Sequence, residues 1–344
     1  GLSLGLETAG FELLFANELS PMASETFAYN LLNADLEKQN AIQNVHWISS
    51  QHPRSDVCAR LRENPENAVG LGKHHHSDLL KDGLQVTDLY RSLLIGSITD
   101  LNRILGDDKC DPLRKLLEGA RYDGGIDLVS GGPPCQSFSL AGLREYSNQR
   151  NTLPSDFSEF VKLIEPKIVL LENVSGILRA FKINRTKYYA WFEVAKAFAK
   201  VGYVPLCLHV NAKYVGAAQN RPRFILIALR EDIYSQISES FEDRRFREML
   251  EPGKALFDRM AVGENPGYGC LPYYDVEKQP EMFRASILSN LLPDKANELI
   301  SVKKAIDDLR DNNIRASSYV TSINRAFKNR FSHKKNKSNN HQMR

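Results

Sequence analysis

Cysteine is scarce in this 344-residue sequence, with five widely spaced thiols and no C-x-x-C pair. An odd number without paired spacing argues against a disulfide framework or a zinc ribbon and suits a reducing cytosol. No apolar run approaches the ~20 residues that a membrane helix needs. The first residues include Glu7 and Glu12 but no basic n-region, so no signal peptide is predicted. The remaining composition, 42% hydrophobic and 25% charged, is typical of a globular protein.

Acidic residues are absent after Asp311, although the formal net charge of the whole chain is only +3. Aromatic Phe327 and Phe331 are interleaved with the basic residues there. Such a basic, aromatic segment is typical of nucleic-acid contact, although a charge run is more often a solvated tail. The basic residues of this segment are Arg315, Arg325, Lys328, Arg330, Lys334, Lys335, Lys337 and Arg344.

Short apolar runs alternate with helical patterns up to residue 230. This alternation predicts an α/β fold, a doubly wound and mostly parallel sheet. The expected strands are residues 11–16, 93–98, 126–129, 168–171, 203–210 and 224–229. The expected helices are residues 2–10, one that begins at Ser20-Pro21, one capped by Thr99-Asp100, 155–164, 188–201 and 302–309. From residue 231 the sheet pattern stops, and helix fragments and loops follow.

Three adjacent histidines, His74, His75 and His76, lie within the polar stretch 37–90. They suggest a metal site or a tag remnant. Adjacent residues on a helix or strand do not share a face, so they make a poor single site. We expect a surface loop there and no bound metal.

The stretch 131–139 (GGPPCQSFS) follows the expected strand 126–129. Glycine allows a tight turn and close approach of a ligand, and proline stiffens the turn. Cys135 therefore stands at the carboxyl end of a strand, where α/β sheets bind ligands. The alternative is a strand-ending turn with an incidental cysteine.

Two carboxylates also follow expected strands. Glu172 directly follows the strand 168–171, where an acid facing a cleft can donate a proton. Glu18 follows the strand 11–16, where an acid can accept hydrogen bonds from ribose hydroxyls. Glu172 could equally cap a helix, and a solvated loop carboxylate is the commoner role for a residue such as Glu18.

Arg221 and Arg223 alternate before the strand 224–229, so both can point the same way on an extended segment. Paired guanidinium groups suit phosphates or polar base edges. A salt-bridged loop is the alternative.

Four short motifs, in this order along the chain, resemble those of the cytosine-5 DNA methyltransferase family. They are Asn-Glu (17–18), Pro-Cys-Gln (134–136), Leu-Leu-Glu-Asn-Val (170–174) and Gln-Asn-Arg-Pro-Arg (219–223). The resemblance covers residues 1–230 well and residues 300–344 weakly. It implies a Rossmann-like methyltransferase fold. It also implies that residues 1–230 form the catalytic domain and that residues 231–344 are a linker and the beginning of a target recognition region.

The resemblance assigns chemical roles to four residues. Cys135 would be the nucleophile that adds to C6 of a flipped-out cytosine, and Glu172 would hydrogen-bond or protonate N3. Arg221 and Arg223 would support the flipped nucleotide and the catalytic loop. The methyl group would come from S-adenosylmethionine, and the residues expected to hold it are Gly1, Glu18, Leu19, Ser97, Ile98 and Pro134.

Some positions depart from the family pattern. Of its Phe-x-Gly-x-Gly-Gly loop only Gly1 remains, Leu19 replaces the usual aromatic residue, and Ser97 replaces a carboxylate. The closing Gly-Asn-Ala-Val element is missing. We therefore expect part of a longer protein, incomplete at both ends, and poor S-adenosylmethionine binding by residues 1–344 alone.

The resemblance predicts a DNA (cytosine-5-)-methyltransferase of the bacterial restriction-modification type. Its substrate would be double-stranded DNA. The protein would be a monomer in the cytoplasm, associated with the nucleoid, without a metal or a membrane. Two alternatives stay open: a tRNA cytosine-5 methyltransferase of the same fold, and a catalytically silent nucleic-acid-binding fragment.

Overall fold

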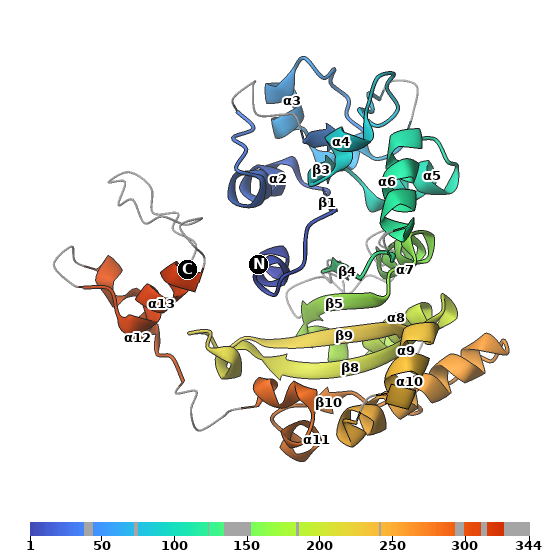
Figure 1. Cartoon of the computed structure of the whole chain (residues 1–344), viewed down its shortest axis with the longest axis vertical. Helices are drawn as coiled ribbons and strands as arrows, with labels where there is room; N and C mark the ends of the chain where they lie inside the picture. The colour runs from blue at the N-terminus through green and yellow to red at the C-terminus, as the bar shows by residue number, and fades with distance from the viewer. Residues whose placement is uncertain are drawn as a thin grey trace. The chain divides into compact units, whose positions relative to one another are not determined.

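The computed structural model describes residues 1–37, 44–71, 75–122, 124–133, 153–183, 186–240, 242–292, 299–310 and 315–326. The chain divides into two compact units, Gly1–Ile126 and Asp127–Arg344 (Figure 1). Each unit carries a mostly parallel sheet with helices, which confirms the predicted α/β class. None of the described helices combines the length and apolarity needed to cross a bilayer.

The first unit is built on a parallel sheet of three strands in the order β1-β3-β2. These are β1 (Phe15–Glu18), β2 (Val45–Trp47) and β3 (Ser92–Ile95). The central strand β3 is buried at every residue, as expected for a continuous apolar run covered on both faces. Its Leu93 and Ile95 pack with Trp47 in the core of this unit.

Helices cover this small sheet. Ser20 caps α2 by accepting the N–H of Ala23 at 3.4 Å, and Pro21 occupies the first turn, both as the sequence predicts. Short helices α3 and α4 lie between β2 and β3, and longer α5 and α6 follow β3. Their bounds are α1 (Leu2–Thr8), α2 (Pro21–Phe27), α3 (Val57–Arg62), α4 (Val86–Leu89), α5 (Ile98–Gly106) and α6 (Asp111–Tyr122).

Three expected boundaries in this unit are wrong. The strand expected at 93–98 is β3, which ends at Ile95, because Ser97 already caps the helix that begins at Ile98. The strand expected at 11–16 begins instead at Phe15, because β3, its neighbour in the described sheet, begins at Ser92 and a parallel ladder needs both strands. The helix after β3 is not capped by Thr99 and Asp100. Ser97 caps it, accepting the N–H of Thr99 at 3.2 Å, while Asp100 is buried and accepts the N–H of Gly70 at 2.7 Å.

Within its described residues, the stretch 37–90 contains β2, α3 and α4, to which the sequence pattern gave no assignment. His74 lies outside the described residues. His75 bonds through its ring to the carbonyl oxygen of Gly70, and His76 pairs through its backbone with Ser50.

The second unit is built on a sheet of five strands in the order β10-β8-β9-β5-β4. Strand β9 is antiparallel to both neighbours, and the other pairs are parallel. The strands are β4 (Leu128–Gly131), β5 (Ile168–Val174), β8 (Tyr203–Asn211), β9 (Pro222–Arg230) and β10 (Tyr274–Asp275). A separate two-stranded hairpin is formed by β6 (Phe181–Ile183) and β7 (Thr186–Tyr188).

Aromatic residues fix the helices α7 (Leu153–Ile164) and α8 (Ala190–Lys200) in this unit. Phe157 on α7 meets Phe198 on α8 edge to face, with ring centroids 5.8 Å apart. Trp191 and Phe192 on α8 are fully buried. Both helices were expected from the sequence, with boundaries shifted by two residues at most.

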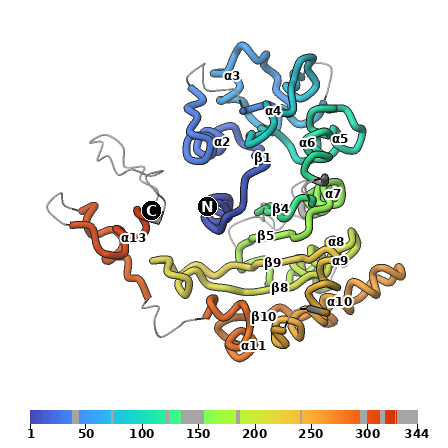
Figure 2. The backbone as a smooth tube through the Cα atoms, in the orientation of Figure 1, coloured from blue at the N-terminus to red at the C-terminus, as the bar shows by residue number. Residues whose placement is uncertain are grey.

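Residues after 230 belong to the same core, contrary to the expectation that the sheet pattern stops there. Helix α10 (Arg244–Ala261) packs against β8 and α8, and β10 adds a strand beside β8 (Figures 1 and 2). Buried Phe246, Tyr274 and Phe283 share one cluster with Leu206 and Leu208 of β8. A strand of two residues is too short to leave a periodic pattern in the sequence. The remaining helices of this part are α9 (Glu231–Ser240) and α11 (Pro280–Arg284).

The last described segment holds α12 (Val302–Ile306) and α13 (Ser318–Ala326), which pack on each other. The α-helix expected at 302–309 continues after Ile306 as a 3-10 turn, Asp307–Leu309. Residues 327–344, which carry most of the basic segment, lie outside the described residues.

Gly253 lets α10 approach β8. A Cβ atom at this position would lie 2.0 Å from the carbonyl oxygen of Pro205. Alanine normally gains about 1 kcal/mol over glycine inside a helix. Because the contact atom belongs to the backbone, we expect Gly253→Ala to lower the free energy of unfolding by about 1–3 kcal/mol instead.

Chemical denaturation of the 344-residue chain, followed by circular dichroism, measures this change. Ala255 is exposed on the same helix, so Ala255→Gly should cost only about 1 kcal/mol and serves as the control. A Gly253→Ala protein at least as stable as the unchanged chain would contradict the close approach.

Candidate active site

Glu172 forms an ion pair with Arg223 across two neighbouring strands. The Arg223 Nε and Glu172 Oε1 atoms are 2.5 Å apart, and the side chains are 15% and 36% exposed. The antiparallel register places Glu172 opposite Ile225 and Arg223 opposite Val174, so the two side chains are diagonal neighbours on one face. Arg223 Nε has no directed hydrogen bond within the described residues, so the contact is an ion pair.

The start of the Gly-Gly-Pro-Pro turn lies beside this ion pair. Strand β4 pairs Gly131 with Leu171, one residue before Glu172. A Cβ atom on Gly132 would lie 3.5 Å from Glu172 Oε2, and the Asn173 side chain donates a hydrogen bond to the carbonyl oxygen of Pro133 at 3.1 Å. Asn173 of β5 therefore holds the segment that leads toward the cysteine, and Glu172 lies beside it.

Cys135 and Pro134 lie outside the described residues, so their predicted roles stay predictions. Pro133, which Asn173 holds, is separated from Cys135 by one residue. Within the described part of the chain, Cys110 and Cys207 are buried, and burial raises the pKa of both thiols. Neither of these two has the character of an activated nucleophile.

Asn211 shapes the loop that carries Arg221. Its side-chain oxygen accepts the N–H groups of Lys213 at 3.3 Å and Arg221 at 3.1 Å. Its side-chain nitrogen donates to Asn220 at 2.9 Å and to Glu277 at 3.2 Å. The Arg221 side chain is exposed, whereas Arg223 turns to Glu172. The two arginines alternate as predicted, but they have different surroundings.

The sequence analysis missed Asn211 and Glu277. Glu277 also accepts from Tyr214 at 3.0 Å and pairs with Lys213 at 2.8 Å, which holds the pKa of Glu277 below its usual range. Asn211 ends a strand directly before a turn, which is a usable signal. Glu277 lies more than 50 residues from the loop that it contacts, and no local pattern reveals it.

Four of the residues expected to hold the cofactor gather at the carboxyl edge of the first unit's sheet. Glu18 ends β1 opposite Ile95, and its carboxylate accepts the N–H of Ser20 at 3.0 Å. Gly96 donates its N–H to the Glu18 carbonyl oxygen at 2.9 Å. Leu19, beside Glu18, is 38% exposed, and Ser97 caps the helix that begins with Ile98.

Gly96 requires glycine for two reasons. Its φ is +145°, and a Cβ atom would lie 2.8 Å from the Cβ of Ile48. The turn after β3 is therefore fixed close to Glu18. Gly1 instead caps α1, where its carbonyl oxygen accepts the N–H of Gly5 at 3.0 Å. Its expected role with the cofactor stays a prediction.

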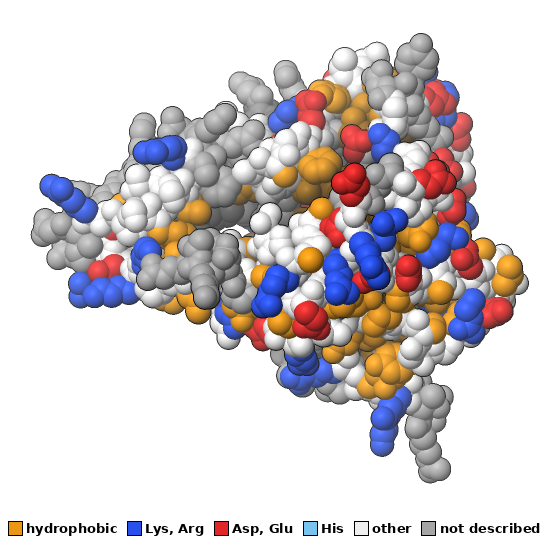
Figure 3. Space-filling view, turned by 60° about the horizontal axis from the view of Figure 1, so that its bottom comes forward, with side chains coloured by type: hydrophobic (Ala, Val, Ile, Leu, Met, Phe, Trp, Pro, Cys, Tyr) orange, Lys and Arg blue, Asp and Glu red, His pale blue; other side chains and the backbone are white. Residues whose placement is uncertain are grey.

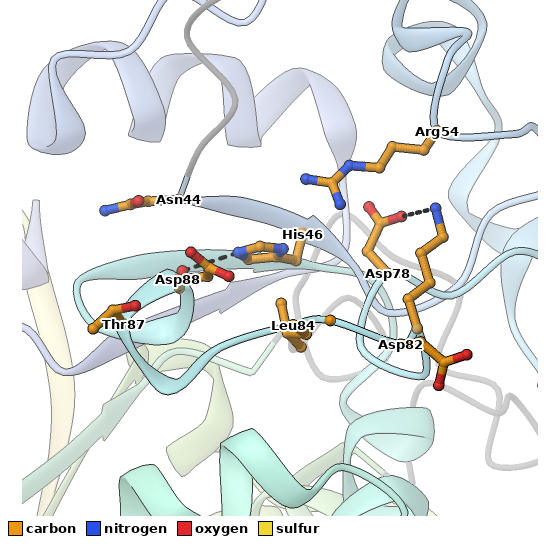
Figure 4. Close-up of a pocket in the computed structure, with 10 residues that line it drawn as sticks. Asn44, His46, Arg54, Asp78, Asp82, Leu84, Thr87 and Asp88 are labelled. Atoms are coloured by element: carbon orange, nitrogen blue, oxygen red, sulfur yellow. Dashed lines mark hydrogen bonds and ion pairs between the residues drawn. The ribbon is translucent and has the colours of Figure 1, made fainter.

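A cavity of about 510 Å³ in the first unit contains none of the residues predicted from the sequence (Figure 4). His46 lies in it, with Nε2 2.9 Å from the Asp88 carbonyl oxygen and Nδ1 without a described hydrogen-bond partner. Asp78 is paired with buried Arg60 at 2.7 Å. The lining residues are Asn44, His46, Arg54, Asp78, Lys81, Asp82, Gly83, Leu84, Thr87 and Asp88.

Charges on the molecular surface are mixed. Figure 3 shows Lys and Arg side chains beside Asp and Glu side chains and apolar patches on the visible face. The described residues include no group of His, Cys, Asp and Glu side chains suited to a metal ion. The predicted catalytic residues that are described lie in the second unit, and five of the six predicted cofactor residues lie in the first.

Comparison with known proteins identifies the family. The model of the family described as C-5 cytosine-specific DNA methylase matches residues 114–344, which are more than half of the chain. The chain therefore belongs to this family, and the resemblance predicted from its motifs is confirmed.

Curated relatives match shorter stretches. The Type II methyltransferase M.DdeI of Desulfomicrobium norvegicum is 41% identical over 107 residues, which are 31% of this chain and 25% of that protein. The Type II methyltransferase M.NgoMIV of Neisseria gonorrhoeae is 32% identical over 162 residues, 47% of each chain. The chain thus spans less than half the length of these relatives.

Among solved structures, a putative DNA modification methyltransferase encoded within a prophage of E. coli is similar to this chain. The sequence identity is 22% and the TM-score is 0.38, over 67% of this chain and 44% of that one.

Burial lowers the pKa of His46, and the nearby Arg54 charge acts in the same direction, while the Asp88 carbonyl oxygen and the Asp78 charge oppose it. The folded chain therefore prefers neutral His46. At a pH above the unfolded-state pKa of about 6.5, the imidazole is neutral in both states and the lowered pKa does not affect stability. As the pH drops below that value, the unfolded state takes up the proton more readily, so the free energy of unfolding falls.

Denaturation of the unchanged chain and of His46→Gln, each at pH 7.5 and pH 5.5, tests this expectation. Glutamine keeps a side-chain N–H for the Asp88 carbonyl oxygen but does not titrate. The unchanged chain should lose more stability on acidification than the variant. Equal losses would contradict a buried neutral histidine.

Proposed function

We propose that this chain is the S-adenosylmethionine-dependent methyltransferase part of an enzyme that methylates C5 of cytosine in double-stranded DNA. The observation that carries the proposal is the Glu172 carboxylate, anchored by Arg223 beside the segment that leads into Cys135. Family membership and the Type II methyltransferases among the relatives support it. Those relatives come from bacteria, which favours action in a bacterial cytoplasm, at the nucleoid.

In the proposed reaction, the thiolate of Cys135 attacks C6 of a cytosine that has been flipped out of the duplex. An S–C6 bond forms, and the electron pair of the C5–C6 double bond moves into the ring toward N3. Glu172 hydrogen-bonds or protonates N3 and so absorbs the charge that develops there. C5 becomes the nucleophilic carbon of an enamine. After C5 has gained the methyl group, a base takes the C5 proton, the C5–C6 double bond re-forms, Cys135 leaves as the thiolate and the N3 proton returns to Glu172.

Arg223 has a positioning role in this scheme. Because it pairs with one Glu172 oxygen at 2.5 Å, the other oxygen stays available for the base. The exposed Arg221 side chain, on the loop held by Asn211, is suited to a phosphate of the target strand.

S-adenosylmethionine, when bound, supplies an electrophilic methyl group to C5. Glu18 fits the ribose hydroxyls, because the N–H of Ser20 occupies only one of its carboxylate oxygens. Exposed Leu19 offers an apolar surface for the adenine, and Ile98 is proposed to add to it. Pro134 also stays in the proposed cofactor set. Ser97 is less suited to the adenine amino group, since its hydroxyl oxygen already accepts the N–H of Thr99. Gly1 remains part of the proposed cofactor set.

We propose residues 1–230 as the catalytic domain and residues 231–344 as the link to a target recognition region, with the part of that link up to Leu292 packed into the core of the second unit. We also propose that the protein acts as a monomer and without a metal.

Cys135→Ser in the full-length gene product should abolish the covalent adduct with a duplex that contains 5-fluorocytosine, while duplex binding persists. A hydroxyl is a far weaker nucleophile than a thiolate at neutral pH. Denaturing electrophoresis of the trapped complex measures this. Cys58 is exposed on α3, so Cys58→Ser should keep the adduct and serves as the control.

The same trap separates the alternatives. An adduct with a fluorocytosine RNA but not with the duplex would indicate an RNA methyltransferase. Absence of both adducts would indicate a silent binding protein, and a full adduct with Cys135→Ser would rule out the proposed mechanism.

Glu172→Gln should lower methyl transfer to the duplex about 10²–10⁴-fold, the usual loss when a general acid is removed. Transfer of a tritiated methyl group in single turnovers measures the step. The control is Glu193→Gln, which changes a partly exposed carboxylate on α8, ion-paired with Lys196, and should keep the unchanged rate. An unchanged rate for Glu172→Gln would show that this carboxylate only holds Arg223.

A further inference from the structure

The β6–β7 hairpin lies at the same edge of the sheet as Glu172. Strand β5 ends at Val174, and α8, which begins at Ala190, leads into β8 within three residues. Strands β5 and β8 are parallel, since both are antiparallel to β9. Helix α8 must therefore return from the carboxyl edge to the amino edge. The hairpin, which stands between β5 and α8, is left at the carboxyl edge.

The register of the hairpin pairs like charges. Lys182 lies directly opposite Lys187, and both side chains are exposed. Like charges in directly opposite positions destabilise an antiparallel pair. The ion pairs between described residues include neither Lys182 nor Lys187. The hairpin therefore presents two adjacent ammonium groups that no described carboxylate neutralises.

The other face of the hairpin keeps its strands together. Phe181 lies opposite Tyr188, with ring centroids 4.9 Å apart and ring planes tilted by 55°. Because side chains alternate along a strand, this aromatic pair faces away from the lysine pair. A two-stranded hairpin is marginal on its own, and an aromatic pair offsets part of the cost of the lysine repulsion. The lysine substitutions can thus leave the hairpin intact.

We infer that the lysine face of the β6–β7 hairpin, Lys182 with Lys187, binds phosphate groups of the DNA duplex whose cytosine reaches Glu172. This inference rests on the proposed function and adds a backbone-contact site to it. A phosphate group between the two ammonium groups attracts both of them and so offsets their mutual repulsion. Exposed Arg179, two residues before β6, adds a third cation at the same edge.

The chemistry favours backbone contact over base reading. Lysine is a flexible point charge without the planar fork that reads base edges, so it suits phosphate oxygens. Contacts of this kind position a duplex without reading its sequence. The hairpin would hold the strand near Glu172, and sequence reading would belong to another part of the protein.

The test measures duplex binding by the 344-residue chain at several salt concentrations between 50 and 200 mM, using fluorescence anisotropy of a labelled duplex. The double variant Lys182→Gln with Lys187→Gln should reduce the slope of log K against log salt by about 0.9 for each lost phosphate contact. If two contacts are lost, the variant's loss of affinity relative to the unchanged chain should be about 10-fold larger at 50 mM salt than at 200 mM salt.

A matched control removes the same charge elsewhere in the unit. Lys162 and Lys200 are exposed in the last turns of α7 and α8, which lead into the amino ends of β5 and β8. Lys162→Gln with Lys200→Gln should keep the slope of the unchanged chain. Lys182→Arg with Lys187→Arg, which keeps both charges, should also keep it.

Each outcome decides the inference. An unchanged slope in the hairpin variant, or an equal reduction in the control, would overturn it. Binding to RNA but not to the duplex would overturn both the DNA assignment and the proposed substrate. The fluorocytosine adduct, measured in parallel in the full-length gene product, separates the two proposals. A duplex adduct with an unchanged slope would overturn the hairpin contact alone, whereas absence of an adduct would count against the proposed function.

Discussion

The antiparallel ladder between β5 and β9 is the constraint on which the candidate active site depends. Parallel neighbours would bring carboxyl ends together, but here the amino end of β9 meets the carboxyl end of β5. Arg223 at the start of β9 can therefore reach Glu172 at the end of β5. The same register places Arg221 just beyond the edge of the sheet. A shift of one residue would turn Arg223 to the other face and break the pair.

The Glu172–Arg223 pair contributes little to folding. Both side chains are partly exposed, and such pairs contribute about 0–1 kcal/mol. Its importance lies in geometry, because it fixes the direction of a carboxylate beside the turn at Gly132 and Pro133. On the far side of β9, Asn211 fixes the loop before Arg221 with four hydrogen bonds. Local polar contacts thus hold the site on a rigid sheet.

Elements with strong local patterns were predictable from the sequence. Buried strands such as β8 and amphipathic helices such as α7 follow from apolar periodicity. The pairing of Glu172 with Arg223 was not predicted. Features set by distant partners were not predictable. The start of β1 depends on where β3 begins, β10 has only two residues, and Glu277 meets Asn211 across more than 60 residues. The placement of Cys135 lies outside the described residues.

The packing of α10 on β8 constrains how this protein can be recombined with its relatives. Leu206 and Leu208 share one core with Phe246, Tyr274 and Phe283, and Gly253 touches the backbone of β8. A chimera joined directly after Arg230 would separate two halves of a single hydrophobic core and expose both. A junction after Leu292, beyond the last residue of that cluster, leaves the core whole. The exchangeable portion of the chain therefore begins some sixty residues later than the end of β9 suggests.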